Sequence, residues 1–97
     1  MLKMKDVLNG MVSQAERGEA AFYAFGGGLV MRVKWMPSAG QMQVTLERER
    51  IMPSNTEMDT VTREMGALGG WEEVNEAGPD WAGYLCRRYI WFVKGGG

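Results

Sequence analysis

Histidine is absent from the 97 residues of this chain, and cysteine occurs once, as Cys86. Without histidine the chain lacks the most common general base of enzymes and the most common side-chain ligand of transition metals. A lone cysteine inside an apolar segment is more typical of a buried thiol than of a nucleophile. The sequence therefore predicts no catalytic residue, no metal site and no cofactor, and we expect a protein that is not an enzyme.

Long apolar runs are also missing. The longest uninterrupted ones, such as Ala20 to Phe25, are short, whereas a helix that crosses a bilayer needs about 20 apolar residues. Polar residues interrupt the N-terminal segment where a signal peptide would need an apolar core. Small secreted domains usually carry several disulfides, which one cysteine cannot provide. We therefore expect no membrane contact and a cytoplasmic location.

Basic charge is not in excess, because the formal net charge is -1. This balance excludes the global positive field of a protein that works mainly by neutralising phosphates. Acidic residues are concentrated in residues 55–80, which hold seven of them and one basic residue. The seven are Glu57, Asp59, Glu64, Glu72, Glu73, Glu76 and Asp80. Such a run either keeps a surface solvated or attracts a basic partner, so these residues form the first candidate binding surface.

The length predicts a single domain over residues 1–94, followed by a flexible glycine tail at 95–97, because so short a chain cannot divide its buried surface between two cores. Apolar residues at spacings of three and four between Leu2 and Arg17 predict an amphipathic helix. Ser54, with Glu57 three residues later, is typical of a capping box and predicts a second helix that ends at Gly69-Gly70.

Alternation of apolar and polar residues predicts strands at 20–25, 29–35 and 41–49, connected as a meander. A further strand is expected at 83–93, and residues 71–80 read as a loop, with a short edge strand at 71–74 as the alternative. The last strand is apolar on both faces, which indicates a sheet covered on both sides or contact with another subunit. The sequence therefore predicts an α+β fold in the order α-β-β-β-α-β.

A second candidate surface follows from this pattern if the strands pair with their core faces aligned. The opposite face of the sheet would then carry Tyr23, Arg32, Lys34, Arg87, Tyr89 and Trp91. Such residues stack on bases and contact phosphates, or act as the anchors of protein interfaces. The alternatives are that the second helix covers this face, or that Glu47 and Glu49 neutralise it. We interpret this glutamate pair itself as part of a solvated sheet face.

The junction between the third strand and the second helix contains Glu49-Arg50, Pro53-Ser54 and Glu57. Over about fifteen residues this junction resembles small uncharacterised proteins of phages and prophages. The resemblance implies an accessory protein, a class that includes inhibitors of host defence systems, acting in the host cytoplasm. It assigns no functional residue.

Three functions remain as hypotheses. The first is a non-enzymatic accessory protein that binds another protein through the acidic surface and exposed aromatic residues and inhibits it by occluding its surface. A homo-oligomer is the other protein assembly that we consider. The second is a small domain that binds nucleic acid or a nucleotide through the basic and aromatic sheet face. An enzyme that uses Cys86 or paired carboxylates ranks last.

Overall fold

The computed structural model describes residues 4–76, 80–82 and 85–95 of the chain. The elements, in chain order, are α1 (Met4–Glu16), β1 (Ala21–Gly26), β2 (Leu29–Met36), β3 (Gln41–Glu49), α2 (Asn55–Ala67), β4 (Trp71–Glu76), β5 (Asp80–Ala82) and β6 (Leu85–Lys94). The predicted α+β fold is confirmed, with two more strands between the second helix and the last strand.

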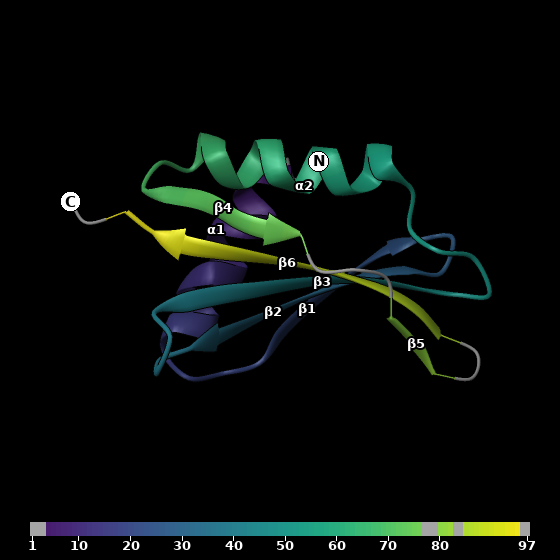
Figure 1. Cartoon of the computed structure of the whole chain (residues 1–97), viewed down its shortest axis with the longest axis horizontal. Helices are drawn as coiled ribbons and strands as arrows, with labels where there is room; N and C mark the ends of the chain where they lie inside the picture. Colours follow the sequence, from purple (N-terminus) through teal and green to yellow (C-terminus); the bar gives the residue numbers. More distant parts are fainter. Residues whose placement is uncertain (1–3, 77–79, 83–84, 96–97) are drawn as a thin grey trace.

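The strands form one antiparallel sheet in the order β1-β2-β3-β6-β4. β3 pairs with β6 from Leu85 to Val93, so β4 and β5, which also pair with β6, both lie on its other side. Figure 1 shows the result: β1 and β4 run along opposite margins of the sheet, and β6 lies between β3 and β4. The predicted meander of the first three strands is confirmed.

The acidic segment that follows α2 is mainly strand, and the prediction of a loop over 71–80 was wrong. Trp71–Glu76 pairs with β6, and so does Asp80–Ala82. An edge strand has one side in water and therefore tolerates charged residues, which is why a segment rich in glutamate can still be a strand. The alternative of an edge strand beginning at Trp71 is confirmed and extends two residues further than expected.

Both helices begin and end near the residues that the sequence indicates. Ser54 caps α2 and forms the predicted capping box with Glu57, and Gly18, at φ +86°, follows the end of α1. The β1–β2 hairpin turns at Gly27 and Gly28, with φ of +60° and +83°, values that suit the tight hairpin turns for which glycine is preferred.

No helix in the described part of the chain is long and apolar enough to cross a bilayer.

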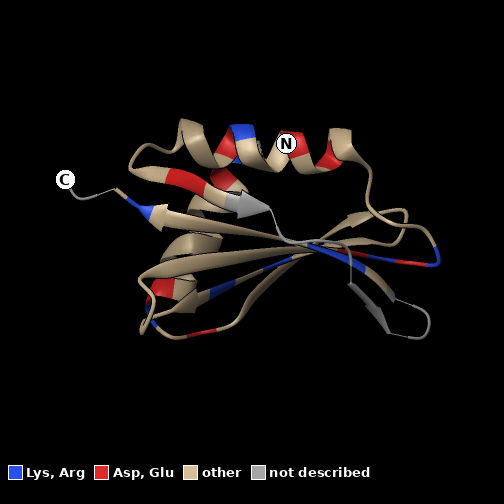
Figure 2. Cartoon of the chain, in the orientation of Figure 1, with Lys and Arg blue, Asp and Glu red and all other residues tan. Residues whose placement is uncertain are grey.

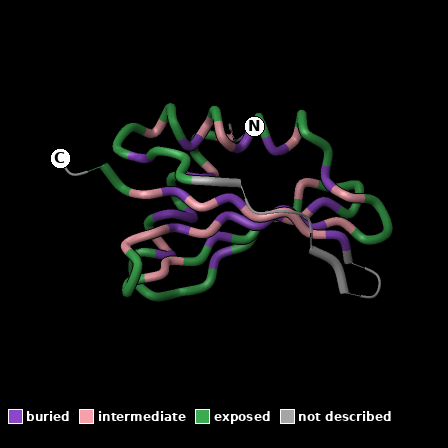
Figure 3. The backbone as a smooth tube through the Cα atoms, in the orientation of Figure 1, coloured by how far each residue is buried: buried purple, intermediate pink, exposed green. Residues whose placement is uncertain are grey.

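Both helices pack against one face of the sheet, the core face. Their buried residues, among them Leu8, Val12, Met58 and Met65, belong to the same cluster as the apolar residues of the strands. The strand residues of this cluster are Ala21, Leu29, Met31, Val33, Met42, Val44, Leu46, Trp71, Ile90 and Phe92. Figure 3 shows buried and less buried residues alternating along the central strands, as expected when one face of a sheet is covered.

The opposite face of the sheet, the open face, is not packed against either helix. In Figure 1 α1 lies behind the sheet and α2 lies beside β4, so the near face of the sheet carries no helix. Of the two alternatives for the last strand, a sheet covered on both sides does not hold for the part of the chain that the structure describes, and contact with another subunit stays a prediction. β6 is central within the sheet, but its second apolar face is only half-buried. This open face is the candidate binding surface.

Candidate binding surface

Cross-strand pairing places the open-face side chains in rows. In one row Phe22 lies opposite Arg32, which lies opposite Thr45, which lies opposite Tyr89. The neighbouring rows are Lys34, Gln43 and Trp91 on one side, and Val30, Glu47 and Arg87 on the other. Residues of one row on one face are within side-chain contact distance. Five of the six residues predicted for this surface therefore share one face.

The β6 residues of this surface are Arg87, Tyr89 and Trp91, at successive positions on the open face. All three are half-buried, so each presents part of its side chain to solvent. Tyrosine and tryptophan combine a large apolar area with a polar group, which suits them to binding surfaces. The exposure of both aromatic side chains on one face favours a binding site over core packing.

Tyr23 is the exception, and its assignment to this surface was wrong. It pairs with Met31, which is fully buried, and it packs edge to face against Phe25 with a 5.0 Å centroid distance on the core side. Phe22 takes the predicted place on the open face, where it is 66% exposed and lies 5.7 Å from the Arg32 guanidinium. Both residues are aromatic, so only the register with β2 identifies the one that faces outward.

Glu47 lies at the centre of the surface and is only 6% exposed, so its assignment to a solvated face was wrong. Arg32 donates a hydrogen bond from Nε to Oε1 of Glu47 at 2.9 Å, and Nε of Arg87 lies 4.0 Å from the same oxygen. The long side chains around Glu47 cover it, although no helix does. A carboxylate in such a position is stable because it is paired with positive charge.

The described side chains of the open face carry balanced charge. The basic residues are Arg32, Lys34 and Arg87, and the acidic residues are Glu47, Glu49 and Glu72, which gives three of each sign. Glu47 holds Arg32 and lies close to Arg87. The surface is therefore aromatic and electrically mixed rather than a basic stripe. The alternative that Glu47 and Glu49 neutralise this face is met by Glu47, which lies beside two of its arginines.

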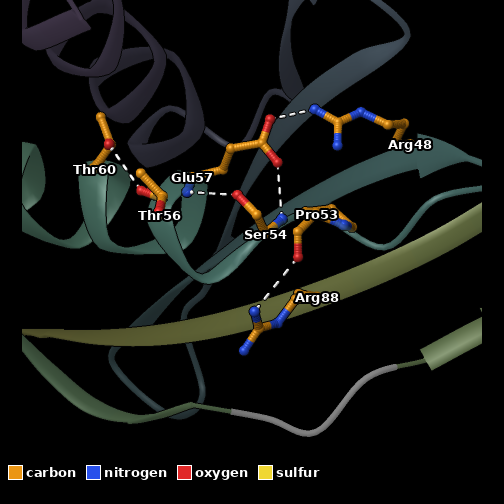
Figure 4. Close-up of polar contacts among 7 residues, drawn as sticks. All are labelled: Arg48, Pro53, Ser54, Thr56, Glu57, Thr60 and Arg88. Carbon is orange, nitrogen blue, oxygen red and sulfur yellow. Dashed lines mark hydrogen bonds and ion pairs between the residues drawn. The ribbon is translucent and has the colours of Figure 1, made fainter.

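The acidic residues of the first candidate surface do not all face solvent. Glu57 forms an ion pair with Arg48 and accepts a hydrogen bond from the backbone N–H of Ser54 at 2.8 Å (Figure 4). Burial raises the pKa of Glu57, but the hydrogen bonds from Arg48 and Ser54 outweigh burial and hold this pKa below its ordinary value. Glu57 thus fastens the start of α2 to β3 within the fold.

Arg88 fastens the same end of α2 to β6. Its guanidinium donates to Oδ1 of Asn55 at 2.6 Å. It also donates to the carbonyl oxygen of Pro53 at 3.4 Å (Figure 4). Two arginines from neighbouring strands therefore hold the junction between β3 and α2. In the described part of the chain, the polar groups of this junction attach the start of α2 to the sheet.

The other acidic residues lie on different sides of the molecule. Asp59 is exposed and Glu64 half-buried on α2, and Glu73 accepts a hydrogen bond from the hydroxyl of Thr62 on that helix at 3.2 Å. Glu72 pairs with Val93 and therefore lies on the open face. Figure 2 shows these charges on α2 and β4, with basic residues nearby. They do not form one continuous acidic surface.

Glu76 and Asp80 complete the acidic set, and their backbones lie in β4 and β5. Their side chains fall outside the part of the chain that the structure describes. Gly95, the first residue of the expected tail, donates a backbone hydrogen bond to the carbonyl oxygen of Gly70, and residues 96–97 are also outside the described part.

Outside the two candidate surfaces, the described residues offer few nucleophilic or metal-ligating side chains. Cys86 is buried on the core face of β6, at 6% exposure, and no group of three or more metal-ligating side chains occurs among the described residues. Sequence reasoning missed Phe22, Gln43 and Thr45, whose side chains line a shallow hollow on the open face with Arg32 and Lys34. The alternation within 41–49 places Gln43 and Thr45 on this face, but only strand register brings them beside Phe22.

Comparison of the chain with protein-family models, with curated proteins and with solved structures finds no match in any of the three.

Proposed function

We propose that this protein binds another protein through the open face of its sheet and acts by covering the bound surface. The binding site consists of Phe22, Arg32, Lys34, Arg87, Tyr89 and Trp91, with Glu47 at its centre. The observation that carries this proposal is that Tyr89 and Trp91 are both partly exposed on a sheet face without a packed helix.

The composition of this surface supports a protein partner. Tryptophan, tyrosine and arginine are the residues that most often dominate the binding energy of protein interfaces. Here the pairing of β2, β3 and β6 places all three types on a continuous sheet. Regular strands hold such anchors in fixed positions, which reduces the entropy lost on binding.

The charge of the surface favours protein over nucleic acid. Affinity for nucleic acid depends on cations that neutralise phosphates, and the described open face carries as many acidic as basic side chains. The Arg32 guanidinium is hydrogen-bonded to Glu47, so a phosphate would have to compete with a carboxylate for it. A protein surface of mixed charge with an apolar centre fits this arrangement better.

The mechanism of such a protein is steric. When the functional surface of the partner lies against the open face, its other ligands cannot bind there while the complex lasts. No chemical step is required. The resemblance of the junction between β3 and α2 to phage and prophage proteins makes a host defence protein the class of partner that we propose.

The test compares two surfaces in the source cell. A photo-reactive phenylalanine analogue replaces Trp91 in one variant and Asp59, exposed on α2, in the other. We expect a specific protein adduct at position 91 and none at position 59. The adduct is then purified, and its direct binding to the full chain and to the Tyr89→Ser/Trp91→Ser variant is measured. Adducts at position 59 alone would move the interface to the acidic side of α2, and wild-type affinity in the double variant would overturn the proposal.

The nucleic-acid alternative has a separate test. The full chain is titrated with single-stranded oligonucleotides at low salt and then at rising salt, because phosphate binding weakens steeply as salt increases. We expect no saturable binding. Binding that disappears in the Tyr89→Ser/Trp91→Ser variant and weakens with salt would replace the protein proposal by the nucleic-acid one.

A further inference from the structure

The two edges of the sheet differ sharply in their side chains. β4, at one edge, has the sequence WEEVNE, and β1, at the other, has the sequence AFYAFG. Native proteins protect exposed edge strands with charged residues, proline or a covering segment. β4 has three glutamates and lies beside α2. β1 has neither a charged residue nor a proline, and its pairing with β2 is regular from Ala21 to Ala24, with one irregularity between Ala24 and Gly26.

The free side of β1 is available to another strand. β1 is the end of the strand order, so among the described strands only β2 pairs with it. In an antiparallel ladder every second residue directs its N–H and C=O away from the paired strand. β1 therefore presents backbone donors and acceptors beside apolar side chains, which is the chemistry that binds a further strand.

We propose that β1 pairs antiparallel with β1 of a second copy of this chain, so that the two sheets become one. If Tyr23 lies opposite Tyr23 of the partner subunit, the core faces and the open faces of the two copies are both continuous. The remaining pairs are then Phe22 with Ala24 and Ala21 with Phe25. Each phenylalanine of one copy therefore lies opposite an alanine of the other copy.

This match of size is what favours a second copy over an unrelated strand. Cross-strand pairs on one face are the units that stabilise a sheet. When residues 21–25 are laid against their own reverse order about Tyr23, each alanine lies opposite a phenylalanine. Phe22 is 66% exposed in one copy and gains an alanine neighbour from the other. The interface is isologous, so it closes at two copies.

The pairing does not depend on the proposed partner-binding role, although Phe22 belongs to both surfaces. It uses the outer side of β1, whereas the anchors Tyr89 and Trp91 lie on β6, with β2 and β3 between. A dimer would place two open faces side by side and raise the avidity for a repetitive partner. Loss of dimerisation would leave the anchors of each copy in place.

The test is the oligomeric state of the full chain by sedimentation equilibrium from about 1 μM to about 1 mM, because an interface of one strand pair belongs to the small and transient class. We expect a monomer–dimer equilibrium. Ala24→Lys puts a charge and a long side chain opposite Phe22 of the partner subunit, and it should raise the dissociation constant about tenfold or more. Ala39→Lys, the same change at an exposed turn residue, should leave it unchanged.

The register has its own measurement, carried out with Cys86→Ala in every variant. Phe22→Cys and Ala24→Cys chains, mixed and oxidised, should cross-link to each other more than either chain cross-links to itself, because a disulfide requires closely opposed Cβ atoms. Circular dichroism checks that Ala24→Lys is folded, and Phe22→Lys is the second variant if it is not. A monomer at every concentration, or a dimer that both lysine variants leave intact, would overturn the proposal.

Discussion

Glu47 accepts a hydrogen bond from Nε of Arg32 at 2.9 Å, although the arginine side chain is 56% exposed and the glutamate side chain only 8%. The pair joins β2 to β3 diagonally across the open face, because Arg32 itself lies opposite Thr45. A carboxylate in this position lies under its neighbours, within reach of two guanidinium groups. It stabilises the surface as well as neutralising it.

Replacing Glu47 with glutamine should therefore lower stability. Glu47→Gln keeps the shape of the side chain but replaces the charged acceptor of the Arg32 hydrogen bond by a neutral amide. We expect the free energy of unfolding to fall by about 1 to 2 kcal/mol. Urea unfolding followed by circular dichroism measures it. Glu49→Gln, an exposed residue on the same strand and face, should change stability by less than about 0.5 kcal/mol. Equal effects of the two substitutions would contradict the central role of Glu47.

Glu57 should make stability depend on pH. Its pKa is held below the ordinary value in the fold, so between the folded and unfolded pKa values the unfolded state binds more protons. The stabilising contribution is complete above the unfolded pKa, about 4.3 for glutamate, and it is lost as the pH falls through the lower, folded pKa. Unfolding free energies of wild type and Glu57→Gln, measured at several pH values, should converge as the pH falls.

Asp59→Asn is the control for this comparison, because Asp59 is exposed on the same helix. We expect the stability difference between wild type and Asp59→Asn to stay small at every pH. A difference between wild type and Glu57→Gln that is constant with pH would show that Glu57 acts only through packing.

Arg50 should be a site where glycine stabilises the protein. It is the only described non-glycine residue with positive φ, at +75°, and the N–H of Ile51 bonds back to the carbonyl of Glu49 at 2.9 Å across it. A left-handed conformation costs about 1–2 kcal/mol for a residue with Cβ, and a glycine at this position would avoid that cost. Part of the stability gained is lost again, because glycine has the greater conformational entropy in the unfolded state. Arg50→Gly should raise the unfolding free energy by about 0.5 kcal/mol.

The matched control is Arg63→Gly, at an exposed position inside α2. Glycine within a helix costs about 1 kcal/mol relative to good helix formers, so the same substitution should have the opposite sign there. Both changes are measured by urea unfolding. Destabilisation by Arg50→Gly would mean that the Arg50 side chain contributes more than its backbone costs.

Cys86 should react slowly with thiol reagents in the native protein. The residue is 6% exposed on the core face, opposite Arg48 of β3, and a buried thiol is inert until the fold opens. Mass spectrometry after timed labelling should find modification at a rate set by unfolding, and rapid modification in urea. Fast labelling of the native chain would show an accessible thiol and would support the hypothesis that Cys86 is a nucleophile.

Local signals in the sequence were enough for much of the fold. The capping box of Ser54 and Glu57 predicts the start of α2 because its two hydrogen bonds need only residues three apart. The alternation in residues 29–35 and 41–49 predicts which side chains of β2 and β3 are buried, because a strand with one covered face repeats every two residues. These features depend on neighbours in the chain.

The proposed binding surface could be predicted only in part. Arg32 and Lys34 were placed on it because β2 has one clearly apolar face. Arg87, Tyr89 and Trp91 share one face of β6 by alternation, although both faces of that strand are apolar. β1 has aromatic residues on both faces, so the alternation gave no reason to choose Phe22 over Tyr23. Pairing of Tyr23 with the buried Met31 makes that choice, and pairing is a contact between segments apart in the sequence.

By itself, then, the sequence determined the types of the first five elements and of the last strand, the ends of the helices and the absence of histidine chemistry. All of these depend on composition or short spacings. Only the tertiary structure decided that 71–76 is an edge strand, that Glu47 is buried between arginines, and that β1 is left at an unprotected edge. Strand order and register arise from pairing between distant segments. The free energy of that pairing belongs to the assembled sheet and to no single stretch of the chain.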